Sequence, residues 1–546
     1  MSPSTAAYSR VEGVIGEVST GRLNVFDPAV AGEDRWLFRV ANRLHVVTRD
    51  RVVRRELLQG PGDRWSPELA LEAERNLRAS GFIRKAEIRP RPRPGGRLDL
   101  EVRTQDTWTL APQFSVGTEG GDHYLIWGLE ENNILGYGKA ASLFHSRIGD
   151  SSRNEFRYRD PRLWGSRQRL TGLYAATPKG DEIGALIDRP FFSLASPYSM
   201  QLLWARIIQE DALFHNAEER SKFIQNFRSV QASIGARINE DDDPVQRILL
   251  GTHYQRDHFD STGDTVSGTL PGDRKLSGPV AGFVLIQPRF IKETYIDKME
   301  RVEDFNVGNE FSIAGGPMLR SWGSDRDRWT LSTLDQQGWR MAEGRFLLAQ
   351  GGLLGRLAGG RPENALAYGN LNLFWKTVWP LPQTWVVHAE INASRRLDGE
   401  NQLILGGNTG LRGYKNNSFT GAKTALLNVE DRLFLTDEFF HLFHLGGVAF
   451  FETGAVAAET SGFRGTRFKS DVGLGFRVAP SRSTTGGVLR MDVAYALNSG
   501  PGSSRWVVSI RGGQAFQIFN STNRNVLRTP AAAIGEESAG VRLRKR

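Results

Sequence analysis

The sequence predicts a large all-β protein: a closed barrel of antiparallel strands that crosses a membrane, preceded by a small α+β domain. Hydrophobic residues make up 39% of the 546 residues, aromatic residues reach 10%, and there are 60 glycines. This composition favours extended, turn-rich chain over helices. Apolar and polar residues alternate through most of the chain after residue 112. No stretch approaches the roughly 18 apolar residues of a membrane-spanning helix, whereas barrel strands alternate and average out as polar.

Charge and cysteine content exclude several classes of protein. Because the chain has no cysteine, it has no disulfide framework, thiolate metal site or cysteine nucleophile. The net charge of +9 comes from 70 Lys and Arg against 61 Asp and Glu, spread along the chain without the concentrated basic patch that nucleic-acid binding needs. Anionic lipid or lipopolysaccharide neighbours fit this charge. Residues 1–10 lack the apolar core of a secretory signal, so we expect a processed amino terminus or a start further upstream.

The amino-terminal module covers residues 13–107, with the pattern strand, helix, helix, strand, strand. Its clearest helix follows Ser66, a typical N-cap, with Pro67 at the first helical position. The next strands are expected at 82–88, which a proline-rich stretch ends, and at 97–104, where apolar and charged residues alternate. These elements predict a three-stranded sheet with helices on one face. The strand at 97–104 is expected either as an exposed edge or in the interior of that sheet.

The following part of the chain is a long array of alternating strands. Segments 385–393, 467–478 and 489–497 each place apolar residues on one face and charged or polar residues on the other. A soluble sandwich shows the same alternation, but this array is too long for one sandwich core and no linker divides it. A closed barrel in lipid needs no division, and the length suits about 16 strands. The segment count runs slightly higher, so we expect some segments within 215–360 to be loops or hairpin extensions.

One motif carries a charge that must find a partner. In "LILGGNTGLRGY", glycines permit a tight fold-back, and Arg412 would enter the barrel interior, where an acidic partner is nearly obligatory. Glu452 in "FFETG" and Glu430 in "LLNVEDRLFL" are the candidate partners. The predicted loop residues are Gly406, Gly407, Leu411, Arg412, Gly413 and Tyr414. The predicted barrel partners are Phe450, Glu452, Gly454 and Glu430.

These motifs resemble those of the BamA/TamA outer-membrane assembly-factor superfamily (bacterial surface antigen family). "LRGY" at 411–414 is similar to the tip of that family's sixth extracellular loop, and "FFETG" is similar to its F-x-D-x-G strand motif, with Glu452 where the family has Asp. The amino-terminal module resembles a polypeptide-transport-associated (POTRA) domain. Five strands follow the loop, near 424–435, 443–455, 467–479, 487–498 and 505–516, which is the number that a 16-stranded family barrel has there.

The resemblance implies an organisation and a location. Residues 1–110 hold a single POTRA-like domain, with its core at 13–107, in the periplasm. Residues 111–516 form the barrel in the bacterial outer membrane, and residues 517–546 are expected to be disordered.

The resemblance also implies a function without covalent chemistry: assembly and insertion of outer-membrane proteins through client capture by the POTRA-like domain and a lateral seam in the barrel. The implied partners are unfolded outer-membrane or secreted polypeptides, outer-membrane lipids or lipopolysaccharide, and accessory assembly proteins. Two alternatives stay open: a two-partner-type polypeptide secretion transporter, and a porin-like or lipid-conduit barrel without a polypeptide client.

The predicted seam lies between the first and last barrel strands, where a client strand can add to an open edge. Glycines near the end of the last strand either weaken closure or relieve crowding. The predicted seam residues are Gln113, Phe114, Ser115, Val116, Gly117, Trp506, Val508, Ile510, Gly512 and Gly513.

Enzyme, cofactor and metal sites are not expected. The chain lacks G-x-S-x-G, H-E-x-x-H and G-x-x-x-x-G-K-[ST] motifs. His441 and His444 form a close pair of histidines, which we interpret as strand or turn residues, not a metal site. The acidic run 241–243 is interpreted as a solvated turn.

Overall fold

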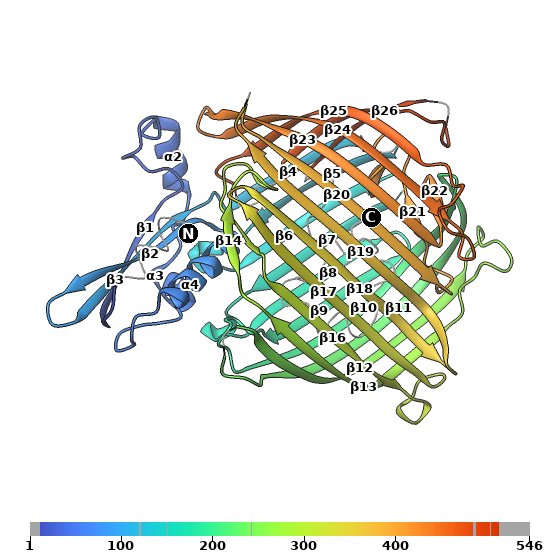
Figure 1. Cartoon of the computed structure of the whole chain (residues 1–546), viewed down its shortest axis with the longest axis horizontal. Helices are drawn as coiled ribbons and strands as arrows, with labels where there is room; N and C mark the ends of the chain where they lie inside the picture. Colours follow the sequence, from blue (N-terminus) through green and yellow to red (C-terminus); the bar gives the residue numbers. More distant parts are fainter. Residues whose placement is uncertain are drawn as a thin grey trace.

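The computed structural model describes residues 11–512 except residues 120–121, 150, 242, 380, 484–487 and 503. It has two parts, a small α+β unit and a large barrel, and the α+β unit lies at one end of the barrel (Figure 1). Among these residues, no helix has both the length and the apolar character needed to cross a bilayer.

The amino-terminal unit is a three-stranded sheet covered by helices. Its strands are ordered β1-β3-β2, with β1 parallel and β2 antiparallel to the central β3. At the start of its longest helix, the Ser66 hydroxyl accepts a hydrogen bond from the Leu69 amide at 3.2 Å, so Ser66 is the N-cap that the sequence indicates. The elements are β1 (Val14–Leu23), α2 (Trp36–Leu44), α3 (Asp50–Glu56), α4 (Pro67–Ala79), β2 (Ile83–Arg93) and β3 (Arg97–Asp106).

Three expectations for this unit need correction. The unit has three helices, where two were expected. The sequence pattern did not predict α2, because this helix has no side-chain cap and no acidic residue in its first turn, which are the usual start signals. Strand β2 continues through Pro90 and Pro92 to Arg93, which is tolerated because β2 is an edge strand. Strand β3 is central, so the exposed-edge alternative for 97–104 is wrong.

The barrel is a closed ring of strands in which β27 lies beside β4. Neighbouring strands pair antiparallel in unbroken chain order, apart from two small hairpins that stand outside the wall, β14 (Phe290–Glu293) with β15 (Glu303–Asn306), and β21 (Leu403–Leu405) with β22 (Phe419–Gly421). Short 3₁₀ turns are η1 (Ile134–Gly136), η2 (Leu163–Gly165), η3 (Arg320–Trp322) and η4 (Gly407–Thr409). The wall strands are β4 (Leu110–Glu119), β5 (Asp122–Glu131), β6 (Ala140–Ile148), β7 (Ser151–Asp160), β8 (Arg169–Thr177), β9 (Gly180–Arg189), β10 (Tyr198–His215), β11 (Glu218–Arg237), β12 (Val245–Ser261), β13 (Arg274–Ile286), β16 (Asn309–Met318), β17 (Arg328–Ala342), β18 (Arg345–Ala358), β19 (Arg361–Thr377), β20 (Gln383–Arg395), β23 (Lys423–Phe439), β24 (Phe443–Ala457), β25 (Lys469–Pro480), β26 (Leu489–Ala496) and β27 (Trp506–Gly512).

The predicted fold class is confirmed, but the strand number is larger than expected. The described residues form a barrel of 20 strands, whereas the sequence length suggested about 16. Five strands follow the loop at 403–421, as predicted, and the last expected one, 505–516, extends beyond the described residues. The additional strands therefore precede the loop. Within 215–360, the segment 287–308 with its β14–β15 hairpin stands outside the wall, as expected of some segments there, and the rest is mostly wall strand.

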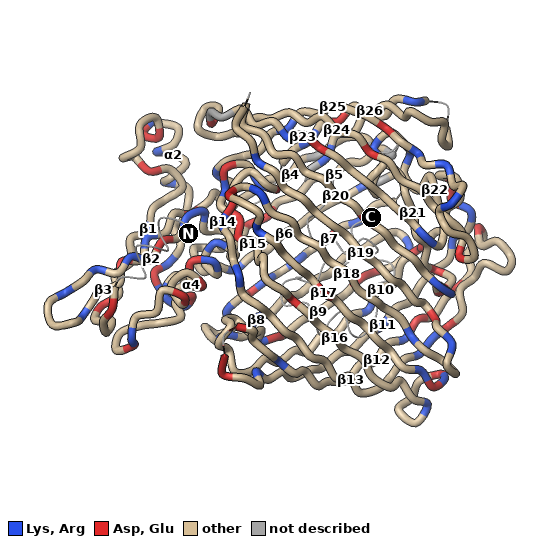
Figure 2. Tube along the Cα trace, viewed as in Figure 1, with Lys and Arg blue, Asp and Glu red and all other residues tan. Residues whose placement is uncertain are grey.

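The wall separates an apolar outer surface from a polar interior. In β25, Leu474 is 69% exposed, whereas Asp471 and Arg477 are buried. In β24, Phe451 faces outward, and its neighbours Phe450 and Glu452 are buried. Figure 2 shows charged residues gathered in the amino-terminal unit and at the two barrel ends, with fewer across the wall between them. This arrangement suits a barrel whose outer surface is covered by lipid.

Candidate functional site

The loop at 403–421 folds back into the barrel at the end opposite the amino-terminal unit (Figure 1). Strands β21 and β22 pair to form its stem, and η4 forms the turn near its tip. Gly410 ends this turn at a φ of 103°, a conformation that favours glycine. Leu411 is fully buried and packs with Leu405, Tyr414 and Leu426. These contacts place the next residue, Arg412, inside the barrel.

Arg412 is buried, and three carboxylates surround its side chain. Its Nε donates to Glu452 Oε1 at 2.8 Å and its Nη2 donates to Glu430 Oε1 at 2.7 Å. Its Nη1 lies 3.3 Å from Asp492 Oδ2. The guanidinium stacks 3.4 Å above the centre of the Phe450 ring. The four polar residues Arg412, Glu430, Glu452 and Asp492 are called the loop-arginine cluster below.

Further arginines pair with the carboxylates of this cluster. Arg432 Nε donates to the second oxygen of Glu430 at 2.8 Å, and Arg477 Nη1 donates to the second oxygen of Asp492 at 2.5 Å. Arg490, also buried, lies 3.9 Å from Asp492, so several buried guanidinium groups surround the three buried carboxylates. Buried charges are tolerated when they are paired and hydrogen-bonded in this way. The cluster holds the loop to β23, β24 and β26.

The loop tip also fits closely against the wall. A Cβ on Gly413 would lie 2.5 Å from Asp471 Cβ, so glycine lets the loop approach β25. The Tyr414 hydroxyl lies 3.0 Å from the Ser470 carbonyl oxygen and 3.2 Å from that of Asn498. A Cβ on Gly406 would lie 2.5 Å from the Lys415 carbonyl oxygen. Small residues and one aromatic side chain therefore set the depth at which Arg412 sits.

The structure brings most of the predicted loop and partner residues together and adds two that sequence reasoning missed. Both candidate partners, Glu452 and Glu430, bind Arg412 at once. Gly454 lies near the stem, where a Cβ would be 3.1 Å from Leu405 Cδ1. The missed residues are Asp492 and Asn428, whose side-chain amide donates to Glu452 Oε1 and to the Gly410 carbonyl, each at 2.8 Å. Alternation along strands 423–439 and 489–496 places both residues on the inward face, and this pattern could have predicted them.

The predicted seam residues lie where β4 and β27 meet. Gly117 is so close to β27 that a Cβ would be 2.5 Å from the Ile510 carbonyl oxygen. The Thr118 hydroxyl donates to the Val508 carbonyl oxygen. The Gln113 side-chain amide instead contacts Glu130 of β5 at 3.2 Å. The large side chains exposed on the outer surface of the seam are Phe114, Val116, Trp506 and Val508. Ser115 and Gly512 lie on these strands, and Gly513 is outside the described residues.

A second inward-folded segment, residues 287–308, connects the amino-terminal unit to the loop-arginine cluster. On its outer side, Arg78 of α4 donates three hydrogen bonds to Asp304, the shortest at 2.7 Å, and Lys292 binds Glu74 of α4 at 3.1 Å. On its inner side, the Ile296 carbonyl accepts a hydrogen bond from Arg432 Nη1 at 2.7 Å. Because Arg432 also binds Glu430, charged contacts run from α4 through this segment to Arg412.

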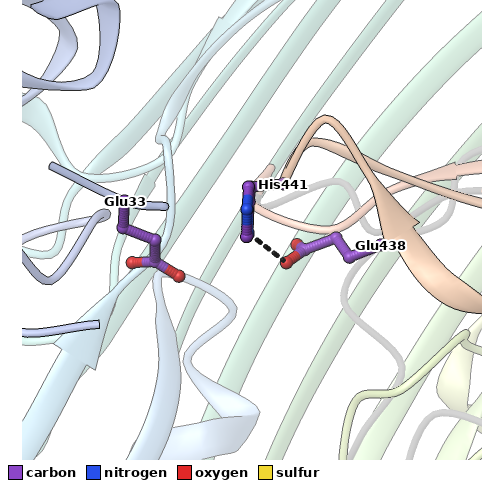
Figure 3. A group of neighbouring side chains, drawn as sticks. All are labelled: Glu33, Glu438 and His441. Carbon is purple, nitrogen blue, oxygen red and sulfur yellow. Dashed lines mark ion pairs between the residues drawn. The ribbon is translucent and has the colours of Figure 1, made fainter. Parts of the chain in front are cut away.

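The junction between the amino-terminal unit and the barrel contains side chains of the types that bind metals. Glu33, Glu438 and His441 converge there (Figure 3), and Glu300, Glu438 and His444 form a second group. Arg482 Nη2 already binds Glu33 at 2.6 Å and Glu438 at 2.8 Å. A guanidinium thus supplies the positive charge that a metal would bring. We therefore interpret this junction as an ion-paired contact, and the absence of a metal site stays a prediction.

A buried carboxyl group lies where β3 leads into the barrel. Asp106 Oδ2 accepts hydrogen bonds from the Thr48 amide at 2.7 Å and from the Thr48 hydroxyl at 2.8 Å. The same hydroxyl accepts a bond from Asn133, next to η1, at 2.8 Å. Burial raises the pKa of Asp106 to about 6, and the bonds from Thr48 oppose this rise. Asp106 therefore connects the stability of the junction to pH.

Comparisons with known proteins found similar solved structures. No protein-family model and no curated protein sequence matches the chain. Similar solved structures include BamA from Haemophilus ducreyi lacking POTRA domains 1–3, at 13% identity and a TM-score of 0.38, covering 91% of this chain and 84% of that one. CdiB from Acinetobacter baumannii is 12% identical with a TM-score of 0.45, covering 91% and 73%. CdiB from Escherichia coli is 13% identical with a TM-score of 0.45, covering 92% and 76%.

Proposed function

We propose that this chain is a bacterial outer-membrane barrel of the BamA/TamA type that assembles and inserts other outer-membrane proteins. In this proposal the amino-terminal unit is a POTRA-like domain in the periplasm that receives unfolded polypeptides. The clients are unfolded outer-membrane proteins. The seam between β4 and β27 is where a client strand adds to the wall.

The observation that carries the proposal is the loop-arginine cluster inside a closed barrel. The loop is held by ion pairs to β23, β24 and β26, the part of the wall that leads to β27 and the seam. A loop fixed to these strands stabilises one side of the seam from within. The edge of β27 can then pair with a client strand in place of β4. Unpaired backbone groups in lipid are energetically costly, so an opened edge favours the addition of a strand.

A polypeptide secretion transporter is the second candidate, because the same parts can serve passage through the lumen. The inward segments 287–308 and 403–421 favour the assembly role. Both make ion pairs with the wall, and a chain passing through the lumen would have to break these pairs.

The test uses the absence of native cysteines to lock the seam. Thr118→Cys with Val508→Cys would join β4 to β27, and Leu474→Cys with Val493→Cys, a paired position on β25 and β26, is the matched control. Protein in liposomes is assayed for folding of an unfolded barrel client and for ion conductance. We expect the wild type and the oxidised control to accelerate client folding, and the oxidised seam variant to lose that activity until it is reduced.

Two outcomes would contradict the proposal. If the locked seam leaves client folding unchanged, lateral strand addition is wrong. If the wild type conducts ions or exports a polypeptide without accelerating the folding of any barrel, the transporter or conduit alternative replaces the assembly role.

A further inference from the structure

Helix α2 of the amino-terminal unit leaves large apolar side chains on its surface. Trp36 is 70% exposed, Leu37 50%, Val40 42% and Leu44 72%. At 100° per residue these four occupy one arc of about 100° on the helix. Such a continuous apolar face is unusual on a water-exposed helix and marks an interaction surface.

The other faces of α2 have distinct roles. Phe38 is buried: its ring stacks on Phe26 at 4.2 Å, and Ala41 packs against the same group of side chains. Arg39 and Arg43 lie on the flank between this protein-facing side and the exposed apolar arc. The helix contains no acidic residue. Its composition is that of an amphipathic helix that lies in a membrane interface, with apolar residues toward the acyl chains and arginines toward the phosphates.

Contacts hold α2 at the rim of the barrel. The Phe38 ring lies 6.4 Å from the ring of His441, in the turn between β23 and β24, and Leu442 of that turn packs on the same cluster. Phe439 and Phe440 beside it are 51% and 63% exposed. Figure 1 shows α2 next to this end of the barrel. Exposed aromatic residues at a barrel rim are typical of the membrane–water boundary.

Apolar surface continues from the helix to the rim. A cavity of about 240 Å³ opens between them, lined mainly by Leu37, Phe38, Trp108, Leu442, Phe443 and Pro480. Phe443 is also exposed on the barrel. The arc on α2 is therefore next to apolar barrel surface.

We propose that α2 is a membrane-binding helix whose Trp36, Leu37, Val40 and Leu44 enter the periplasmic leaflet, with Arg43 at lipid phosphates. This inference rests on the proposed placement of the barrel in a membrane. Continuity with the apolar barrel rim favours lipid as the occupant. On the flank, Arg43 matches anionic headgroups, whereas Arg39 is paired with Asp34 at 3.1 Å. The helix would fix the amino-terminal unit at the bilayer surface beside β23 and β24.

Fluorescence quenching in vesicles tests this placement. Because the chain has no cysteine, single Leu44→Cys, Leu474→Cys and Arg64→Cys variants of the full chain can each carry one bimane label. Leu474 is an outward barrel position, and the Arg64 side chain is 83% exposed on the amino-terminal unit. The vesicles contain phosphatidylcholine and phosphatidylglycerol, with or without lipid carrying a nitroxide near the top of its acyl chain. Aqueous iodide is the second quencher.

We expect the nitroxide lipid to quench the Leu44 label at least half as strongly as the Leu474 label, and to leave the Arg64 label unchanged. Replacing phosphatidylglycerol with phosphatidylcholine should reduce quenching at Leu44 at least twofold. If the Leu44 label behaves like the Arg64 label while Leu474 is quenched, the inference is wrong and the barrel placement stands. A Leu44 label reached by neither quencher would mean that a protein surface covers α2, which also overturns the inference. If Leu474 escapes lipid quenching, the proposed membrane location itself fails.

Discussion

Glu452 holds Arg412 at two points, one on the side chain and one on the backbone. Glu452 Oε1 accepts from Arg412 Nε at 2.8 Å, and Oε2 accepts from the Arg412 main-chain amide at 2.6 Å. One carboxylate therefore fixes both the guanidinium and the backbone at the loop tip. This relationship explains how a 19-residue loop segment, Leu403–Gly421, keeps one position inside a wide barrel.

Replacing Arg412 tests the loop-arginine cluster. Arg412→Ala leaves Glu430, Glu452 and Asp492 buried without their shared cation, and removing one partner of a buried pair costs about 3–5 kcal/mol. We expect the folded barrel to unfold at lower temperature on semi-native gels and client folding to slow, with strand content by circular dichroism unchanged. Arg412→Lys, which keeps the charge but not the planar fork, should be intermediate. Unchanged gel migration and activity in Arg412→Ala would rule out an anchoring role.

Shortening Glu452 tests the two-point contact. Glu452→Asp keeps the charge but is one methylene shorter, so we expect it to retain only one of the two bonds to Arg412. A hydrogen bond involving charged groups contributes about 1.5–3 kcal/mol, and thermal unfolding should show a loss of this size, smaller than that of Arg412→Ala. Equal stability of Glu452→Asp and the wild type would mean that the backbone contact is unimportant.

A single glycine tests the close approach of the loop tip to β25. Gly413→Ala would place a Cβ 2.5 Å from Asp471 Cβ, and overpacking of this kind costs about 1–3 kcal/mol. Gly462→Ala is the matched control, because its Cβ would meet nothing within 4 Å. We expect only Gly413→Ala to lower the unfolding temperature. The same shift in both variants would point to a general effect of losing glycine.

The contact between α4 and segment 287–308 can be measured with a double-mutant cycle. Arg78 and Asp304 are 9% and 17% exposed, so their bidentate pair is largely shielded from solvent. Arg78→Ala and Asp304→Ala should each increase hydrogen exchange in segment 287–308, and the double variant should add little, with a coupling of about 0.5–3 kcal/mol. Strictly additive effects would show that the two side chains act independently.

The pKa of Asp106 predicts a pH dependence of the junction. Its folded-state pKa of about 6 lies above the ordinary value of 3.8, so the folded state binds more protons between these values. The contribution of Asp106 to stability therefore falls as pH rises from about 4 to about 6, by at most about 3 kcal/mol, and this contribution is constant above that window. Hydrogen-exchange protection of residues 48–56, corrected for intrinsic rates, should decrease over this range. Asp106→Asn should abolish the slope, and an identical slope in that variant would assign it to another group.

The alternation of apolar and charged residues determined the fold class and much of the candidate site. A period of two places alternate side chains on opposite faces of a strand, so Glu430 and Glu452 were predictable as inward residues. An arginine between glycines, in a segment that must enter a buried space, needs carboxylates whatever the details of the fold.

Long-range pairing decided what the sequence alone did not. The number of wall strands depends on where each turn falls. Because β14 and β15 have the same alternation of apolar and polar residues as the wall strands near them, the sequence alone does not show that this hairpin lies outside the wall. Asp492 joins Arg412 across 80 residues, and α4 meets Asp304 across 226. Helix α2 has no capping signal and is placed by packing against a barrel turn. Such contacts depend on strand register and barrel closure, which follow from the whole ring of hydrogen-bonded neighbours and not from any local pattern.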